Sequence, residues 1–329
     1  MVSWRLAVAS VALTVLAGSA VAAEWPQRPV RILYPYAAGS AGDGAARLLA
    51  QRLSDAFRQP VIIENRLGAN GTLAAQAVAR APADGYTLFW ATTPQIAISP
   101  IMTKVSYDPV RDFAPISAVI TNSWVLVVNS QMPVKTVAEF VEYVRARPNK
   151  LVYAEGGVGS VGHLTMAMFL KRAGLEMTNV SYQGNAPALS DVIAGHLPTM
   201  FSVLGDTLPH AGSDSVRLLA VSSEKRSLQL PNVPTIGESG FPGFRANAWN
   251  GLLAPAKTAQ AIIDRIASEV GRAVKDQAFV ERLANLGVEA VGSNPAEFAG
   301  MISADMGLWA DAVKMAGLSA ELEHTNSRQ

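Results

Sequence analysis

Short apolar runs alternate with helical patterns along most of the chain. The first run covers residues 30–34, and a helical pattern opens at Asp43 after a loop of small residues. Further strands are predicted over 60–65, 86–91, 124–129, 151–154, 180–182, 200–203, 217–221 and 249–255. Helices are predicted over 43–57, 72–80, 136–147, 164–173, 186–195, 259–275, 278–286 and 295–315. This alternation predicts an α/β fold whose sheet is mostly parallel.

Two of these segments carry strong local signals. Thr136 followed by Glu139 predicts a capping box at a helix start. Asn294, Pro295 and Glu297 predict a well-capped final helix. The run 124–129 is so apolar that we expect it to be buried on both faces.

Two glycine-rich loops, 35–42 and 155–163, each join a predicted strand to a predicted helix. The first helical turn has backbone N–H groups without intrahelical partners, and the helix dipole adds positive charge there. Each loop could therefore hold an anion through its main chain, and no Lys or Arg occurs between Tyr34 and Asp43. The alternative is a tight β–α turn that binds nothing. Two such units predict two lobes that face a cleft.

Several side chains near these loops have two interpretations. Asp43 could cap its helix or accept a hydrogen bond from a ligand ammonium or hydroxyl group. Tyr36, Tyr182 and Trp249 could be core aromatics, although the two tyrosines lie at strand ends beside polar loops. The sequence leaves both interpretations open.

Enzymatic alternatives find weak support. Gly157, Gly159 and Gly162 match a dinucleotide fingerprint, but no acidic residue follows at about 20 positions to hold a ribose. Ser160 and His163 invite a hydrolase interpretation, but the first glycine of a nucleophile elbow is missing. We therefore predict no catalytic residue, no cofactor and no metal site.

The N-terminal segment and the composition indicate where the protein works and which partners it lacks. Residues 1–23 read as a secretory signal peptide, with Arg5, an apolar run over 6–16 and a cleavage site near Ala22-Ala23. The chain has no cysteine, which excludes disulfides, a thiol nucleophile and a lipid-modified cysteine. The 27 basic and 26 acidic residues become balanced once Arg5 is removed, which argues against nucleic acid as a partner. We expect an exported periplasmic protein.

Motifs spread over the mature chain then point to a family. They cover residues 35–43 (PYAAGSAGD), 59–71, 83–88, 107–117, 182–189, 230–244 and 248–255. In this order they resemble the solute receptors of tripartite tricarboxylate transporters, known as the TctC or Bug family. The resemblance spans essentially all of the chain after the leader.

The resemblance implies a type II periplasmic-binding-protein fold, with two Rossmann-like lobes and a ligand cleft between them. Lobe 1 would cover 24–124 plus 250–329, and lobe 2 would cover 125–249. A small carboxylate would be held by main-chain amides and waters and passed to membrane permease subunits, with the receptor acting as a monomer. The matching ligand positions are Tyr36, Ala38, Gly39, Ser40, Ala41, Gly42, Asp43, Thr92, Thr93, Glu155, Gly157, Val158, Gly159, Ser160, Tyr182, Gln183, Gly184 and Asp206.

The sequence departs from the family pattern at positions that bear on the ligand. Ser40 replaces a usual glycine, Glu155 stands where a small residue is usual, and Ser202 replaces a common Asp. A carboxylate at Glu155 should repel a second acid group; the alternatives are that it accepts hydrogen bonds from an amine or hydroxyl group, or that it turns away from the site. A monocarboxylate with an amino or hydroxyl group is therefore expected over a symmetrical dicarboxylate. The predicted function is a non-enzymatic receptor for a small carboxylate. The alternative is a periplasmic sensing module for a membrane signalling partner.

Overall fold

The computed structural model of the protein describes residues 25–318, and the leader predicted over residues 1–23 lies outside them. The strands are β1 (Val30–Tyr34), β2 (Val61–Asn65), β3 (Thr87–Thr92), β4 (Phe113–Asn122), β5 (Trp124–Asn129), β6 (Val152–Glu155), β7 (Thr178–Ser181), β8 (Thr199–Val203), β9 (Val216–Val221), β10 (Ala248–Pro255) and β11 (Glu289–Ala290). The α-helices are α1 (Ala41–Phe57), α2 (Thr72–Ala79), α3 (Ser99–Met102), α4 (Val137–Arg145), α5 (Val161–Ala173), α6 (Asn185–Ala194), α7 (Leu204–Thr207), α8 (Gln260–Ala273), α9 (Gln277–Asn285) and α10 (Pro295–Met315). Short turns of other helix types are η1 (Ala69–Gly71), η2 (Pro94–Ile98) and η3 (Leu208–His210).

The first sheet has the strand order β11-β4-β10-β3-β1-β2. The pairs β1–β2 and β1–β3 are parallel, whereas β10 is antiparallel to both β3 and β4. The expectation of a mostly parallel sheet is therefore wrong for this lobe. The physical reason is that β10 brings the chain back from the second lobe and inserts between β3 and β4 in the opposite direction.

The second lobe contains the antiparallel sheet β8-β5-β9 and the parallel pair β6–β7. Its central strand β5 shows period-two packing. Leu126 and Val128 enter one hydrophobic cluster, while Val125 and Val127 enter another on the opposite face. The expected burial of this strand on both faces is confirmed.

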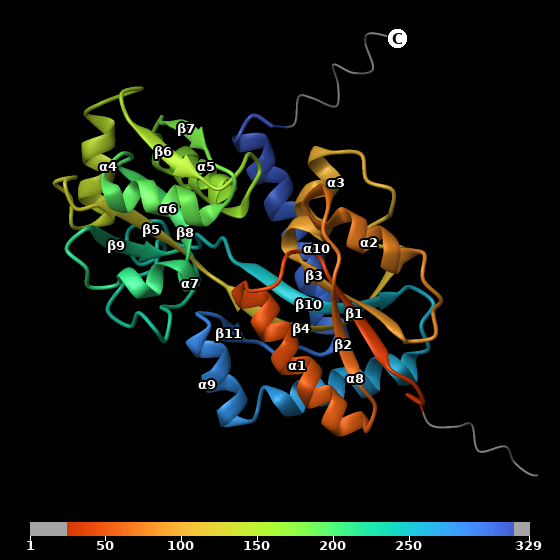
Figure 1. Ribbon diagram of the computed structural model, residues 1–329. Helices are drawn as coiled ribbons and strands as arrows, with labels where there is room; N and C mark the ends of the chain where they lie inside the picture. Colours follow the sequence, from red (N-terminus) through yellow and green to blue (C-terminus); the bar gives the residue numbers. More distant parts are fainter. Residues whose placement is uncertain (1–24, 319–329) are drawn as a thin grey trace, which may run out of the picture.

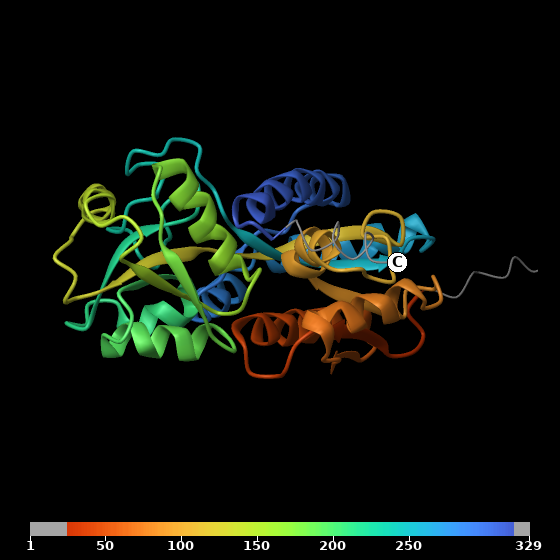
Figure 2. The same cartoon turned by 90° about the horizontal axis from the view of Figure 1, so that it is seen from above.

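The two lobes lie side by side and are joined by several crossings (Figure 1, Figure 2). Ser123 alone separates β4 from β5, and the chain returns over residues 222–247 into β10. Helix α10 also belongs to both lobes, because Phe298 packs in a cluster with the first sheet and Trp309 packs in a cluster with β5 and α5. The lobe limits inferred from the sequence stay a prediction. None of the helices in residues 25–318 is long and apolar enough to cross a bilayer.

Helix starts show how the local sequence sets the fold. The expected cap at Asn294 is present as a full capping box, with Glu297 N donating to Asn294 Oδ1 and Asn294 N donating to the Glu297 carboxylate, both at 2.9 Å. At Thr136 only half of the expected box forms, because the Glu139 carboxylate accepts from Lys135 N instead. The polar residues that follow the strand predicted over 86–91 do not form an open loop, because Pro94 begins the π-helical turn η2.

Candidate functional site

A cavity of about 470 Å³ lies between the two lobes. One side is formed by residues that follow strands or begin turns of the first lobe: Tyr36, Asn70 and Pro94. The other side comes from the second lobe: Trp124, residues 156–162, Asn185 and Val203. Ligands of open α/β sheets bind at the carboxyl ends of strands, and here Tyr36 follows β1 and residue 156 follows β6.

The N-terminus of α5 supplies donors to this cavity. Ser160 is the N-cap, and its Oγ accepts from His163 N at 3.3 Å. Val161 and Gly162 occupy the next two positions, where backbone N–H groups lack an intrahelical acceptor, and both line the cavity. A Cβ at Gly162 would lie 2.7 Å from the carbonyl oxygen of Phe201, so only glycine lets this turn pack so closely. The helix dipole favours an anion at this point.

The charge of the lining fits a site that uses main-chain donors. No Lys, Arg, His, Asp or Glu is among the described residues that line the cavity. A larger cavity of about 540 Å³ lies beside α10, but its lining holds three acidic side chains, Glu224, Glu289 and Asp305, against two basic ones, Lys225 and Arg245. The Asp305 carboxylate there is held by Arg245 at 3.1 Å. The smaller cavity is therefore better suited to an acid group.

Two buried ionisable groups support the 156–162 loop from beneath. Glu155 is 1% exposed, and its carboxylate accepts from Gly157 N at 2.5 Å. His163 Nδ1 accepts from Gly159 N at 3.1 Å. Burial lowers the pKa of His163, with the Glu155 carboxylate acting in the opposite direction. Two loop amides that the sequence offered to a ligand are thus used within the protein.

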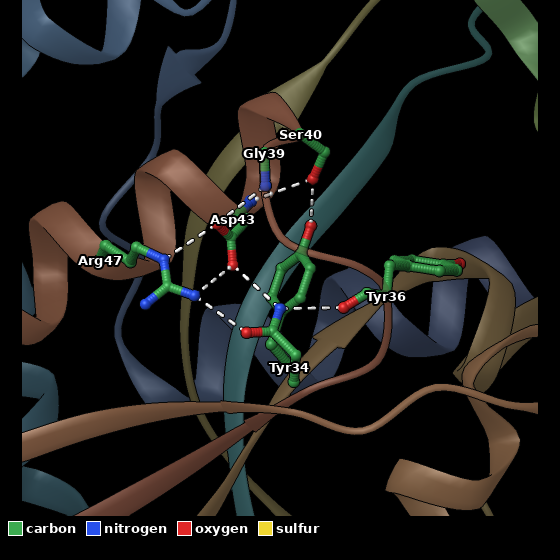
Figure 3. A network of polar contacts seen from close by, with 7 residues as sticks. Tyr34, Tyr36, Gly39, Ser40, Asp43 and Arg47 are labelled. Atoms are coloured by element: carbon green, nitrogen blue, oxygen red, sulfur yellow. Dashed lines mark hydrogen bonds and ion pairs between the residues drawn. The ribbon is translucent and has the colours of Figure 1, made fainter.

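The first glycine-rich loop is organised by a different network (Figure 3). The Asp43 carboxylate accepts from Gly39 N at 3.1 Å, from Asn65 Nδ2 at 3.0 Å and from Arg47 Nε at 2.9 Å. Desolvation opposes the charged form of Asp43, yet these hydrogen bonds outweigh it and hold its pKa below the ordinary range. The N-cap of α1 is Ser40, not Asp43, and its Oγ also contacts Tyr34 Oη at 2.7 Å.

Tyr36 differs from the rest of this loop because it lines the cavity. Figure 3 shows its ring turned away from the Asp43 network. Its hydroxyl accepts from Gln95 Nε2 at 2.7 Å, and burial raises its pKa. The predicted residues Ala38, Gly39, Ser40, Ala41, Gly42 and Asp43 are not part of the cavity lining.

Several of the remaining predicted residues outside the lining have hydrogen-bond partners within the protein. Thr92 Oγ1 donates to Gln95 Oε1 at 2.6 Å, and Thr93 Oγ1 accepts from Trp249 N at 2.9 Å. Tyr182 Oη donates to Asp191 at 2.5 Å. Gln183 and Gly184 lie just before α6, and Asp206 lies in α7. The predicted residues that meet at the cavity are Tyr36, Gly157, Val158, Gly159 and Ser160.

Several lining residues were not named individually from the sequence, although residues 156, 161 and 162 belong to the loop that was expected to hold an anion. The residues not named are Asn70, Pro94, Trp124, Gly156, Val161, Gly162, Asn185 and Val203. Asn185 directly follows a predicted ligand segment, so its place at the start of α6 was the available signal. Trp124 and Val203 were noted only as strand residues.

The geometry gives little support to the enzymatic alternatives. Ser160 Oγ is engaged as a helix cap and His163 Nδ1 is engaged by Gly159 N, so the two side chains do not form a nucleophile–base pair. Within residues 25–318, no group of three or more His, Cys, Asp or Glu side chains is placed to hold a metal ion.

Comparison with known proteins identifies the architecture. Residues 45–318 match the model of the tripartite tricarboxylate transporter family receptor. The chain belongs to this family. Its two-lobed α/β fold is that of periplasmic solute-binding proteins.

Three solved structures illustrate the similarity. Rpa4515 of R. palustris with adipate is 34% identical, with a TM-score of 0.78, over 89% of this chain and 99% of that one. The periplasmic binding protein BugD is 31% identical, with a TM-score of 0.74, over 89% and 99%. MatC of Rhodopseudomonas palustris with bound malate is 31% identical, with a TM-score of 0.74, over 88% and 100%.

Proposed function

We propose that this receptor captures a small carboxylate in the cavity between its lobes and delivers it to the permease of a tripartite transporter. The observation that carries the proposal is an uncharged cavity, lined from both lobes, with the first turn of α5 in its wall. The adipate and malate held by the family members Rpa4515 and MatC support a ligand of this class.

Main-chain groups are sufficient for this task. The dipole contributes about 0.3–1 kcal/mol for a charge at a helix N-terminus. Each charge-assisted hydrogen bond adds about 1.5–3 kcal/mol. The amides of Val161 and Gly162 therefore provide specificity for an anion without a basic side chain.

The position of the cavity between the lobes also explains how the lobes would close on a ligand. Because Tyr36 and Asn70 belong to the first lobe and Val158 to the second, a ligand in the cavity touches both lobes. A ligand that contacts both lobes stabilises the closed arrangement over the open one. We propose binding without turnover, by an exported monomer that works in the periplasm.

Val158 offers the direct test, because the residue is 55% exposed, lines the cavity and can be changed without disturbing the core. Val158→Asp places a carboxylate beside the α5 N-terminus, whereas Val158→Asn adds polarity of similar size without charge. Calorimetric titration with a panel of small carboxylates should show at least about tenfold weaker binding for the Asp variant only, equivalent to about 1.4 kcal/mol.

Equal affinities of the two variants would contradict the proposed site. Turnover of a bound carboxylate by the wild-type protein would contradict the proposed role as a receptor. Co-purification with two permease subunits is expected, and co-purification with a membrane kinase in their place would favour the sensing alternative.

A further inference from the structure

Asn185 is the side chain whose hydrogen bonds bear most directly on the ligand. It is the first residue of α6 and lines the cavity. Its Nδ2 donates to Ser202 Oγ at 3.1 Å and to Asp206 Oδ2 at 2.6 Å. Both amide hydrogens are thereby engaged within the second lobe.

The orientation of this amide is set by chemistry. A carboxylate oxygen only accepts hydrogen bonds, so the nitrogen of Asn185, and not its oxygen, must face Asp206. Asp206 lies outside the cavity that Asn185 lines, and it borders a different hollow beside α6. The amide oxygen therefore points away from Asp206. No side chain or backbone group in residues 25–318 donates to it.

From this arrangement we infer that Asn185 Oδ1 is a hydrogen-bond acceptor for the ligand, held in place by Asp206. The inference rests on the proposed carboxylate site and adds the substrate class: a carboxylate that carries an ammonium, amide or hydroxyl group at its other end. A second carboxylate would bring acceptor against acceptor, and the charge of Asp206 behind the amide adds to that repulsion.

This assignment replaces the role that the sequence gave to Glu155. The Glu155 carboxylate is buried, accepts from Gly157 N and is not part of the cavity lining. A preference for donor-bearing ligands therefore arises from Asn185 and Asp206 instead. Neither the spacing nor the type of these residues signals the pair, which forms across 21 positions of the chain.

The test uses two matched ligand series measured by isothermal titration calorimetry. The six-carbon series is hexanoate, 6-hydroxyhexanoate, 6-aminohexanoate and adipate. The four-carbon series is butanoate, 4-hydroxybutanoate, 4-aminobutanoate and succinate. In the series that fits the cavity, the hydroxy or amino compound should bind the wild-type protein about tenfold or more tightly than the dicarboxylate.

Asp206→Asn provides the decisive variant. An amide at position 206 can donate to Asn185 Oδ1, which allows the Asn185 amide to turn over and present Nδ2 to the cavity. The ratio of affinities should then move by about tenfold or more toward the dicarboxylate. Asn185→Leu should abolish the preference for the donor-bearing compound. Asp214→Asn removes the same charge from an exposed position of the same lobe and should leave the ratio unchanged.

The outcomes distinguish a failure of the proposed carboxylate function from a failure of the role assigned to Asn185. If no member of either series binds the wild-type protein, the proposed carboxylate function fails. If carboxylates bind but the dicarboxylate is preferred, or if Asp206→Asn leaves the ratio unchanged, the role of Asn185 is overturned while the proposed function stands. Thermal melting of each variant reports whether it is folded.

Discussion

His163 Nδ1 accepts a hydrogen bond from the backbone N–H of Gly159 at 3.1 Å. This contact requires Nδ1 to be unprotonated, because two donors would otherwise face each other. It fixes the turn of the loop that lines the cavity, since Gly159 has φ +75° and Val158 beside it is exposed to the cavity. A buried imidazole thus controls the shape of the ligand site without lining it.

The first prediction concerns pH. Burial lowers the pKa of His163 below its ordinary value of 6.5, so the unfolded chain binds more protons than the folded one just below pH 6.5. Stability contributed by the neutral imidazole should be present above this pH and lost as the pH falls through and below it. Thermal melts between pH 8 and pH 5 should therefore show a steeper acid decline for the wild-type protein than for His163→Asn. Asparagine keeps an acceptor near Nδ1 but does not titrate.

His210→Asn is the matched control, because His210 lies away from the loop at the end of η3. Its melting profile should follow the wild-type profile. A His163→Asn protein with an unchanged acid decline would contradict the role of the imidazole.

The second prediction concerns Asp43. Asp43 is 3% exposed, and its carboxylate accepts hydrogen bonds from Gly39, Arg47 and Asn65. Asp43→Asn should lower the free energy of unfolding at pH 7 by about 1–3 kcal/mol, because a charged acceptor for these donors is lost. Since the folded pKa is held low, this penalty should disappear as the pH falls through the acidic range in which the wild-type carboxyl group is protonated.

Urea unfolding at several pH values measures this effect. Asp55→Asn, an exposed change in the same helix, should cost less than about 0.5 kcal/mol. Similar costs for the two variants would mean that the Asp43 network contributes little.

The third prediction concerns lobe closure. A Cβ at Gly287, after α9, would lie 2.4 Å from the Cα of Gly205 in α7, so the backbones of the two lobes are in contact. Gly205→Ala would bring a methyl group within 3.0 Å of the Leu286 carbonyl oxygen. We expect about threefold to tenfold weaker ligand binding, because the closed state becomes less populated while each lobe stays folded.

Calorimetry and small-angle scattering with bound ligand test this expectation. Gly271→Ala in α8 adds a methyl group where nothing lies within 4 Å and serves as the control. If both variants bind and compact equally well, the contact between Gly205 and Gly287 does not limit closure.

The fourth prediction concerns tryptophan fluorescence as a signal of ligand binding. Trp124 lines the cavity, whereas Trp90, Trp249 and Trp309 are at most 2% exposed and lie outside its lining. Ligand binding should change the tryptophan fluorescence mainly through Trp124. Trp124→Phe should remove most of the signal while calorimetry still detects binding, and Trp25→Phe should retain it. Loss of the signal in the Trp25 variant alone would place the responding residue elsewhere.

The local sequence predicted the strands and helices well, but it predicted less well which residues pack around them. The burial of β5 on both faces and the cap of α10 follow from neighbouring residues in the chain, and both form as predicted. The sequence did not indicate the turn at residues 94–98, because its polar residues are buried by partners that are distant in the chain. Gln95, which is 0% exposed, donates from Nε2 to Tyr36 Oη and to the Asn70 carbonyl oxygen.

The site, too, has some features that neighbouring residues set and others that depend on residues distant in the chain. The loop after β6 was expected from its strand–loop–helix pattern to face a cleft, and the family resemblance named Gly157–Ser160 within it, which line the cavity. The direction of a carboxylate is set by whichever donors the fold brings to it, as with Asn65 for Asp43 and Asn185 for Asp206. Such pairings connect elements that are remote in the chain, so the sequence pattern does not contain them.

Helix α10 has one end beneath the first sheet, through Phe298 and Ile302, and the other in the second hydrophobic core, through Trp309 and Ala312. Helix α10 therefore connects the hydrophobic interiors of both halves of the protein. If the lobes open as proposed, we expect one half to shift around this helix, because its two ends are anchored in different halves. A fragment cut to contain either half alone would lose part of its own interior and expose an apolar stripe to water.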